Sequence, residues 1–105
     1  MSAKTRKQNI LDMLQDEPND AELRYMLAME CASEGNDAEA VGRFEELIAV
    51  APNYAPGYHM GARALVRLDR IADAKALLQR GIPAALAQRN EHAAGEMQEL
   101  LASLE

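Results

Sequence analysis

The sequence predicts an all-α fold of about six helices, and three observations lead to it. The composition is rich in Ala, Leu, Glu and Arg, which favour helices, and it holds only four aromatic residues. Turn signals divide the 105 residues into pieces of helical length. Between the turns, apolar residues recur at helical spacing and no alternating strand pattern is seen. Because the turns are short, successive helices should be antiparallel neighbours.

Each helix can be placed from its turns and its apolar stripe. The turn signals lie at 17–20, 34–37, 51–54, 68–70 and 88–90. The stripes are Ile10, Leu11 and Leu14 in a helix near 4–16; Leu23, Met26, Leu27 and Cys31; Ala40, Val41, Phe44, Leu47 and Ile48; Ala62, Leu65 and Val66; Ala74, Leu77, Leu78 and Ile82; and Ala93, Ala94, Met97, Leu100, Leu101 and Leu104. Asp20 and Asp37 are predicted N-caps, because a short carboxylate accepts the free N–H groups of a first turn.

Pro83 leaves the fifth helix open to two interpretations. In a helix interior, proline removes a hydrogen bond and clashes with the carbonyl four residues earlier. The helix could therefore stop at Gly81, or run with a kink from about 71 to 88. The residues at 84–87 are Ala-Ala-Leu-Ala, which continue the helical chemistry and favour the kinked helix.

The net charge and composition of the chain argue against several functional classes. A formal net charge of −6 disfavours nucleic acid as a partner, since phosphate binding needs a basic face. The first seven residues are polar and basic, unlike a signal peptide, and no stretch approaches the length of a membrane span. The single cysteine, Cys31, fits a reducing compartment. A cytoplasmic protein without a membrane partner is therefore expected.

The charge is unevenly distributed along the chain. Residues 1–54 carry 5 basic and 11 acidic residues, whereas residues 55–105 carry 6 of each. In the second half the basic residues concentrate between 63 and 80, where they outnumber Asp69 and Asp73. This segment forms either a locally basic surface or ordinary solvated helix faces.

Similar residues recur at an offset of 34 positions. The offset joins Pro18 with Pro52, Ala28 with Ala62, Ala40 with Ala74, and Phe44 with Leu78. A helix–turn–helix unit of this period is typical of tetratricopeptide repeats. The chain resembles that family, with Leu27-Ala28 at family positions in one helix and Ala40, Phe44 and Pro52 in the next. Arg24 and Cys31 depart from the family pattern.

The resemblance implies a single domain, 1–105, built as a right-handed superhelical stack of antiparallel helix pairs. It divides the chain into a half-repeat helix at 4–17, repeats at 21–54 and 55–88, and a capping helix at 90–104. The small residues Ala28, Ala40, Ala62 and Ala74 should let helix backbones approach closely. Phe44 and Leu78 should fill the space between neighbouring pairs.

The family also implies a concave groove, lined by the first helix of each pair, that binds a peptide or helix of another protein. The groove positions singled out are Tyr25, Met29, Ser33, His59, Arg63 and Arg67, with Glu22, Ala32, Pro56 and Val66 completing the set. Tyr25 and Met29 could instead be ordinary core. Arg63 and Arg67 could favour an acidic peptide. The lysine and asparagine pattern with which some relatives clamp a chaperone tail is absent.

Other functions have less support in the sequence. No serine lies in a nucleophile motif, and His59 and His92 lack metal-ligand spacing with Cys31. Neither an enzyme, a metal nor a cofactor is therefore expected. The alternative is a homodimer, because Met97, Leu100, Leu101 and Leu104 could overfill one side of the last helix. That helix also has a polar face, formed by Glu91, Glu96, Gln98, Glu99 and Ser103, which favours a monomer.

Overall fold

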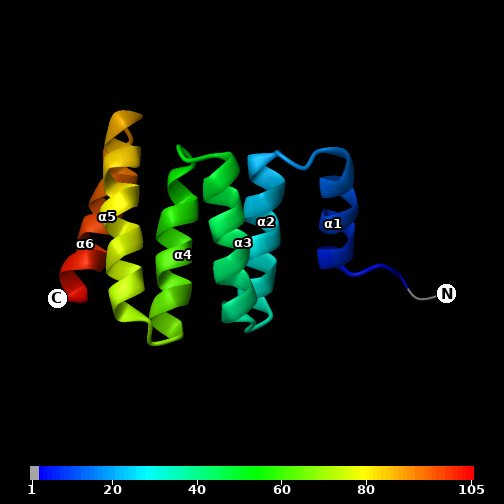
Figure 1. The fold of residues 1–105 in the computed structure, drawn as a ribbon, viewed down its shortest axis with the longest axis horizontal. Helices are drawn as coiled ribbons and strands as arrows, with labels where there is room; N and C mark the ends of the chain where they lie inside the picture. The colour runs from blue at the N-terminus through cyan, green and yellow to red at the C-terminus, as the bar shows by residue number, and fades with distance from the viewer. Residues whose placement is uncertain (1–2) are drawn as a thin grey trace.

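A computed structural model describes residues 3–105, which form six helices and no strand (Figure 1). The helices are α1 (Arg6–Asp16), α2 (Ala21–Ser33), α3 (Asp37–Val50), α4 (Ala55–Arg67), α5 (Ile71–Ala87) and α6 (Glu91–Ser103). Successive helices run antiparallel and stack along the longest axis of a molecule that measures 50 × 29 × 19 Å. The prediction of an all-α stack is confirmed.

The helix boundaries repeat the period seen in the sequence. The helices α2 and α4 begin at Ala21 and Ala55, which are 34 residues apart, and α3 and α5 begin at Asp37 and Ile71, again 34 apart. The helix α5 is longer than α3, with 17 residues against 14. The division of the chain into repeats 21–54 and 55–88, with flanking pieces at 4–17 and 90–104, stays a prediction.

Side-chain caps fix where the helices start. The Asp20 carboxylate accepts the N–H of Leu23 at 2.9 Å, as predicted. The prediction for Asp37 was wrong, because the N-cap of α3 is Asn36 and Asp37 is the first helical residue. The Asn36 side chain accepts the N–H of Glu39 at 3.3 Å and donates to its carboxylate at 3.0 Å. This reciprocal pairing across the first turn makes Asn36 the better cap.

The helix α5 runs without interruption through Pro83 to Ala87. The interpretation in which the helix stops at Gly81 is therefore wrong. The helix that runs from about 71 to 88 is confirmed, while its kink at Pro83 stays a prediction. Gly81 has a different role, because it is buried where α5 meets its neighbours. A Cβ atom at this position would lie 2.5 Å from the Cβ of Tyr58 and 2.8 Å from the Sδ of Met97. The missing side chain lets α5 pack closely on both α4 and α6.

Small side chains also line the other helix contacts. Ala28, Ala40, Ala62 and Ala74 are completely buried, as predicted, and so are Phe44 and Leu78. A Cβ at Gly57 would lie 2.9 Å from Leu47, which shows that α3 and α4 are equally close. The core is thus a continuous seam that runs the length of the stack.

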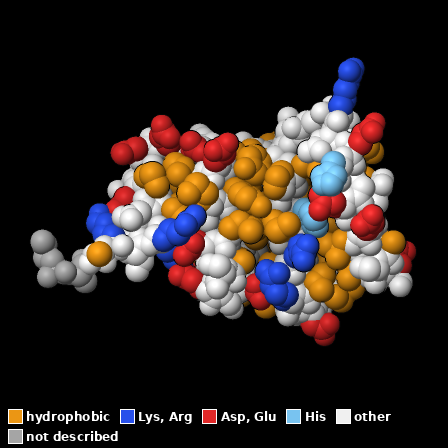
Figure 2. All heavy atoms as spheres, turned by 180° about the vertical axis from the view of Figure 1, so that it is seen from behind, with side chains coloured by type: hydrophobic (Ala, Val, Ile, Leu, Met, Phe, Trp, Pro, Cys, Tyr) orange, Lys and Arg blue, Asp and Glu red, His pale blue; other side chains and the backbone are white. Residues whose placement is uncertain are grey.

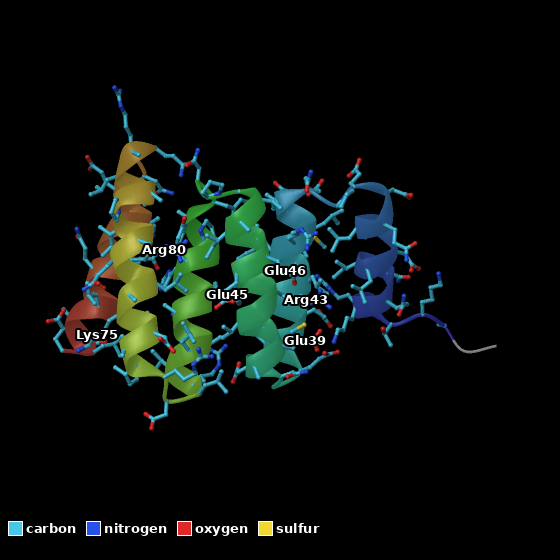
Figure 3. All side chains as sticks on the ribbon, in the orientation of Figure 1. Glu39, Arg43, Glu45, Glu46, Lys75 and Arg80 are labelled. Carbon is cyan, nitrogen blue, oxygen red and sulfur yellow. The ribbon has the colours of Figure 1, made fainter. Side chains whose placement is uncertain are left out.

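The helices form two layers. On one side α4 contacts both α2 and α6, and α3 and α5 lie on the other side. The α3 and α5 surface carries many charged side chains, including Glu45, Glu46 and Lys75 (Figure 3). We call the opposite surface, formed by α2, α4 and α6 and bordered by α1, the groove face. Within residues 3–105, no helix has the length and apolar character needed to cross a membrane.

Candidate functional site

Three adjoining hollows run along the groove face. The first, of about 370 Å³, lies between α1 and α2 and is lined by Arg6, Tyr25, Met26, Met29, Glu30 and Ser33. The second, of about 250 Å³, shares Met29 and Ser33 with the first and adds Ala32, Phe44, Met60 and Arg67. The third, of about 550 Å³, shares Arg67 and adds His59, Arg63, Val66, Glu96, Glu99 and Leu100. Shared lining residues make the hollows one continuous groove.

All six residues singled out in the sequence line this groove. Tyr25, Met29 and Ser33 come from α2, while His59, Arg63 and Arg67 come from α4. Apolar side chains gather along the middle of the groove face, and acidic side chains lie along one edge near the N-terminal end (Figure 2). Histidine and basic side chains gather toward the C-terminal half (Figure 2). Of the remaining expected positions, Ala32 and Val66 line the groove and Pro56 is exposed in the first turn of α4.

Tyr25 belongs to both the core and the groove. Its ring centroid lies 6.2 Å from that of buried Phe44 and 5.5 Å from that of Tyr54, in tilted arrangements that favour aromatic attraction. Burial raises the pKa of the Tyr25 hydroxyl, so the side chain stays neutral near pH 7. The aromatic contacts hold the ring in place while one side lines the first hollow.

Met29 and Ser33 lie one turn apart on α2. Met29 is 37% exposed, so the interpretation of this residue as core is wrong. Its unbranched thioether can adapt to an apolar partner at little cost. The Ser33 hydroxyl donates to the carbonyl of Glu30 at 2.8 Å. Ser33 can therefore offer a partner its lone pairs while its proton stays within the helix.

The two groove arginines differ in their surroundings. The Arg67 guanidinium pairs with Asp37 at 2.9 Å, which ties α4 to the start of α3. Arg63 is exposed and forms no ion pair within residues 3–105. Burial lowers the pKa of His59. Nearby Glu96 raises this pKa and Arg63 lowers it further. Arg63 is thus the basic group of the groove that is most available to a partner.

The helix α6 contributes carboxylates that sequence reasoning missed. Glu96 and Glu99 line the same hollow as His59 and Arg63. Their placement follows from the contact between α6 and α4. The resemblance of 90–104 to the first helix of a repeat is the signal that could have found them, because such helices lie side by side. The expected basic surface therefore has acidic neighbours, and Arg70 also pairs with Asp73 at 2.9 Å.

Cys31 is completely buried, as its predicted role as a small apolar residue requires. Burial is the main cause that raises the pKa of its thiol. A raised thiol pKa disfavours the reactive thiolate. Across residues 3–105, the His, Cys, Asp and Glu side chains form no group of three that could hold a metal ion.

Comparison with solved structures identifies the family. A tetratricopeptide repeat domain protein from Salinibacter ruber, solved in solution by NMR, is 32% identical to this chain. The match covers 84% of this chain and 89% of that protein, with a TM-score of 0.79. The chain belongs to the tetratricopeptide repeat family. No protein-family model and no curated protein matches the sequence.

Two more distant tetratricopeptide-like structures agree with this fold. The TPR2B domain of yeast Sti1, solved as a complex with pHsp70, is 21% identical, and the match covers 93% of this chain and 78% of that one, with a TM-score of 0.87. A protein from Bordetella parapertussis is 19% identical over 97% of this chain and 89% of its own, with a TM-score of 0.82. At these identities the likeness concerns the fold.

Proposed function

We propose that this tetratricopeptide repeat protein is an interaction scaffold that binds a peptide or helix of a partner protein along its groove face. The continuity of the three hollows is the observation that carries the proposal. The groove passes from Arg6 on α1 across α2 and α4 to Leu100 on α6. A groove that follows successive helices suits an elongated ligand better than a compact one.

The lining residues supply the contacts that such a ligand needs. Tyr25 and Met29 offer an apolar surface, one held rigid by aromatic neighbours and the other adaptable. Arg63 can bind a carboxylate or a backbone carbonyl through its planar fork of donors. His59 has a lowered pKa, so near neutral pH it acts as a hydrogen-bonding group and not as a cation.

An acidic peptide is a narrower version of the proposal. It is supported by the free guanidinium of Arg63. Arg67 already pairs with Asp37, and Glu96 and Glu99 share the hollow. An acidic ligand would therefore depend on Arg63 far more than on Arg67.

Homodimer formation is the second function that the sequence suggests. It depends on excess apolar surface on α6. In the structure Met97 is completely buried, and Leu100, Leu101 and Leu104 are half-buried against the core. The last helix thus buries most of its apolar side chains against the core of its own chain. This burial supports groove binding more than it supports homodimer formation.

The groove proposal is tested by affinity capture from native lysate with three proteins side by side. These are the wild type, the groove variant M29Q/R63A and the control E45A/Q79A, which changes exposed residues on α3 and α5. Tyr25 is left intact because its ring packs on Phe44. Circular dichroism and thermal melting verify that all three are folded. A partner held by the wild type and the control but lost by the groove variant is the expected result. A partner held equally by all three would place binding elsewhere.

A further inference from the structure

A fourth hollow lies beside the groove, where α1 ends and α2 begins. Its volume is about 310 Å³, and it is lined by Met13, Asp16, Glu17, Asp20, Glu22, Leu23 and Met26. Met26 also lines the first hollow of the groove, so the two are neighbours. We call this fourth hollow the acidic pocket. No residue expected from the sequence to bind a partner lies in it except Glu22.

The floor of the acidic pocket is apolar and open to solvent. Met13 is 45% exposed and Met26 is 36% exposed, and they count among the few large apolar side chains that the described surface leaves uncovered. Leu23 is half-buried between them and the core. Flexible methionines exposed together are typical of surfaces that adapt to an apolar side chain of a partner.

The carboxylates around this floor form no ion pairs in the part of the chain that the structure describes. Elsewhere in the molecule most acidic side chains are paired, including Glu30 with Arg6, Glu39 with Lys7 and Asp37 with Arg67. Asp16, Glu17 and Glu22 form no ion pair within residues 3–105. The acidic pocket therefore concentrates negative charge. The nearby Arg24 guanidinium is engaged by the Pro18 carbonyl at 2.7 Å and by Glu46 at 3.7 Å.

Helix stability does not explain the two carboxylates of the pocket that come from the end of α1. Asp16 and Glu17 stand at the C-terminal end of α1, where the helix dipole disfavours negative charge. Asp20 and Glu22 do have structural roles, because Asp20 is the N-cap of α2 and Glu22 lies in its first turn, where the helix dipole favours negative charge. Asp16 and Glu17 thus lie beside exposed methionines, at positions where their negative charge is unfavourable for the stability of α1.

We propose that the acidic pocket binds a basic amphipathic segment of a partner protein. An apolar side chain of that segment would pack on Met13 and Met26, and lysines or arginines beside it would pair with Asp16, Glu17 and Glu22. The proposal rests on the proposed scaffold function, since the same ligand could continue into the groove through Met26. It assigns that ligand a basic end, located at α1.

The negative charge of the acidic pocket favours a basic protein segment over nucleic acid, a membrane or a second copy of the chain. Nucleic acid and anionic membranes carry phosphates, which these carboxylates repel. The chain's own basic segment is already engaged, because Lys4 pairs with Asp12, Arg6 with Glu30 and Lys7 with Glu39. A second copy therefore cannot offer this segment. Its basic residues without ion pairs among residues 3–105, such as Arg63, Lys75 and Arg89, are spread over α4, α5 and the turn after α5 and form no single basic segment. A basic segment of a different protein satisfies both the apolar floor and the charged rim.

The test uses two synthetic amphipathic peptides of equal length with the same leucine stripe, one with lysine and one with glutamate at the remaining positions. Fluorescence anisotropy measures binding to the full chain at low and high salt. Methyl signals of isotope-labelled methionine locate the site at Met13 and Met26. The lysine peptide is expected to bind, to shift these two signals and to weaken with salt. The glutamate peptide is expected not to bind.

Two matched variants distinguish the effect of charge in the acidic pocket from the effect of the total charge of the chain. D16N/E17Q/E22Q neutralises the acidic pocket and leaves the Asp20 cap intact, whereas E45Q/E91Q/E105Q removes the same charge from other surfaces. The pocket variant should bind the lysine peptide about tenfold more weakly, while the control stays within about twofold of the wild type. M13Q/M26Q should also weaken binding, since it replaces the apolar floor at exposed positions.

Several outcomes would overturn the inference. These are no binding of the lysine peptide, equal losses in the pocket and control variants, or equal binding of the glutamate peptide. Sedimentation that shows a dimer lost in M13Q/M26Q would assign the acidic pocket to a second copy instead. The scaffold proposal is judged separately, by the native partner and the M29Q/R63A variant, so either proposal can fail without the other.

Discussion

Single glycines decide how closely the helices approach. The chain has buried glycines at helix contacts, such as Gly81, and others with open space around the Cα, such as Gly95. Both lie inside helices, where glycine carries an entropic cost relative to alanine. Only the tertiary contact distinguishes them. The sequence shows a glycine in a helical stretch at each position but does not show what faces it.

Gly81→Ala and Gly95→Ala should therefore shift stability in opposite directions. A Cβ at Gly81 meets the Cβ of Tyr58, which cannot move without its helix, so we expect a loss of about 1–3 kcal/mol. A Cβ at Gly95 meets no atom within 4 Å, so we expect a gain of about 0.5–1 kcal/mol. Urea unfolding followed by circular dichroism measures both. Equal midpoints for the two variants would contradict the close contact at Gly81.

The helix α1 is the least embedded element of the stack. It packs on α2 through Ile10 and Leu14, and it reaches α3 through the Lys7 amine, which lies 2.9 Å from the Glu39 carboxylate. The hydrogen bond from Lys7 lowers the pKa of Glu39. Because the folded pKa lies below the ordinary value of 4.5, the ionised carboxylate stabilises the fold at neutral pH. That contribution is lost as the pH falls through the folded pKa.

Acid should therefore release α1 first, and Glu39→Gln should reduce this effect. We expect the amide hydrogens of α1 to lose protection between neutral pH and about pH 3 in the wild type. Glu39→Gln should show weaker protection at neutral pH and a smaller further loss in acid. Asp12, Glu30 and Glu34 also pair with basic residues of this end, so some acid sensitivity remains. Hydrogen exchange measures both proteins, and an unchanged acid loss in Glu39→Gln would reject the role of Glu39.

The elements themselves followed from the sequence, because helix periods, turns and the 34-residue offset are local features. The error in the N-cap of α3 is equally local. The N-cap of α3 is Asn36 and not Asp37. Either side chain could accept the same backbone N–H group, and only the geometry of the folded chain decides which one does. Pro83 is not such an exception, since the Ala-Ala-Leu-Ala run that follows it already favoured a helix that continues past the proline.

At the scale of the whole molecule, the sequence predicted the groove residues on α2 and α4 but not their neighbours. The six expected residues come from two helices that share one pattern, so their common face could be inferred. Glu96 and Glu99 entered the groove from α6, and Met13 formed the acidic pocket from α1. Both flanking helices lie outside the clearest repeat pattern. Their positions depend on packing against the ends of the stack.

The elongated shape of the stack also predicts which helices a core substitution should destabilise. Among residues 3–105, each helix packs on its chain neighbours. Beyond these, the backbones come close only between α2 and α4 and between α4 and α6, and the Lys7–Glu39 ion pair joins α1 to α3. Stability in such an arrangement is close to a sum of nearest-neighbour terms. Phe44 lies in the middle and Met97 on the last helix, and both are almost completely buried. A loss of packing should therefore destabilise more helices when it occurs at Phe44 than when it occurs at Met97.

We expect Phe44→Ala to cost about 3–5 kcal/mol and Met97→Ala about 2–5 kcal/mol. Phe44→Ala should increase hydrogen exchange in all helices from α2 to α5, because it weakens the centre on which both halves pack. Met97→Ala should increase exchange mainly in α6, while α2 and α3 keep their protection. Val50→Ala, at a position 38% exposed, serves as the control with little expected change. If Met97→Ala raised exchange equally in every helix, the stack would unfold as one unit, and the ends of the groove could not open independently of its centre.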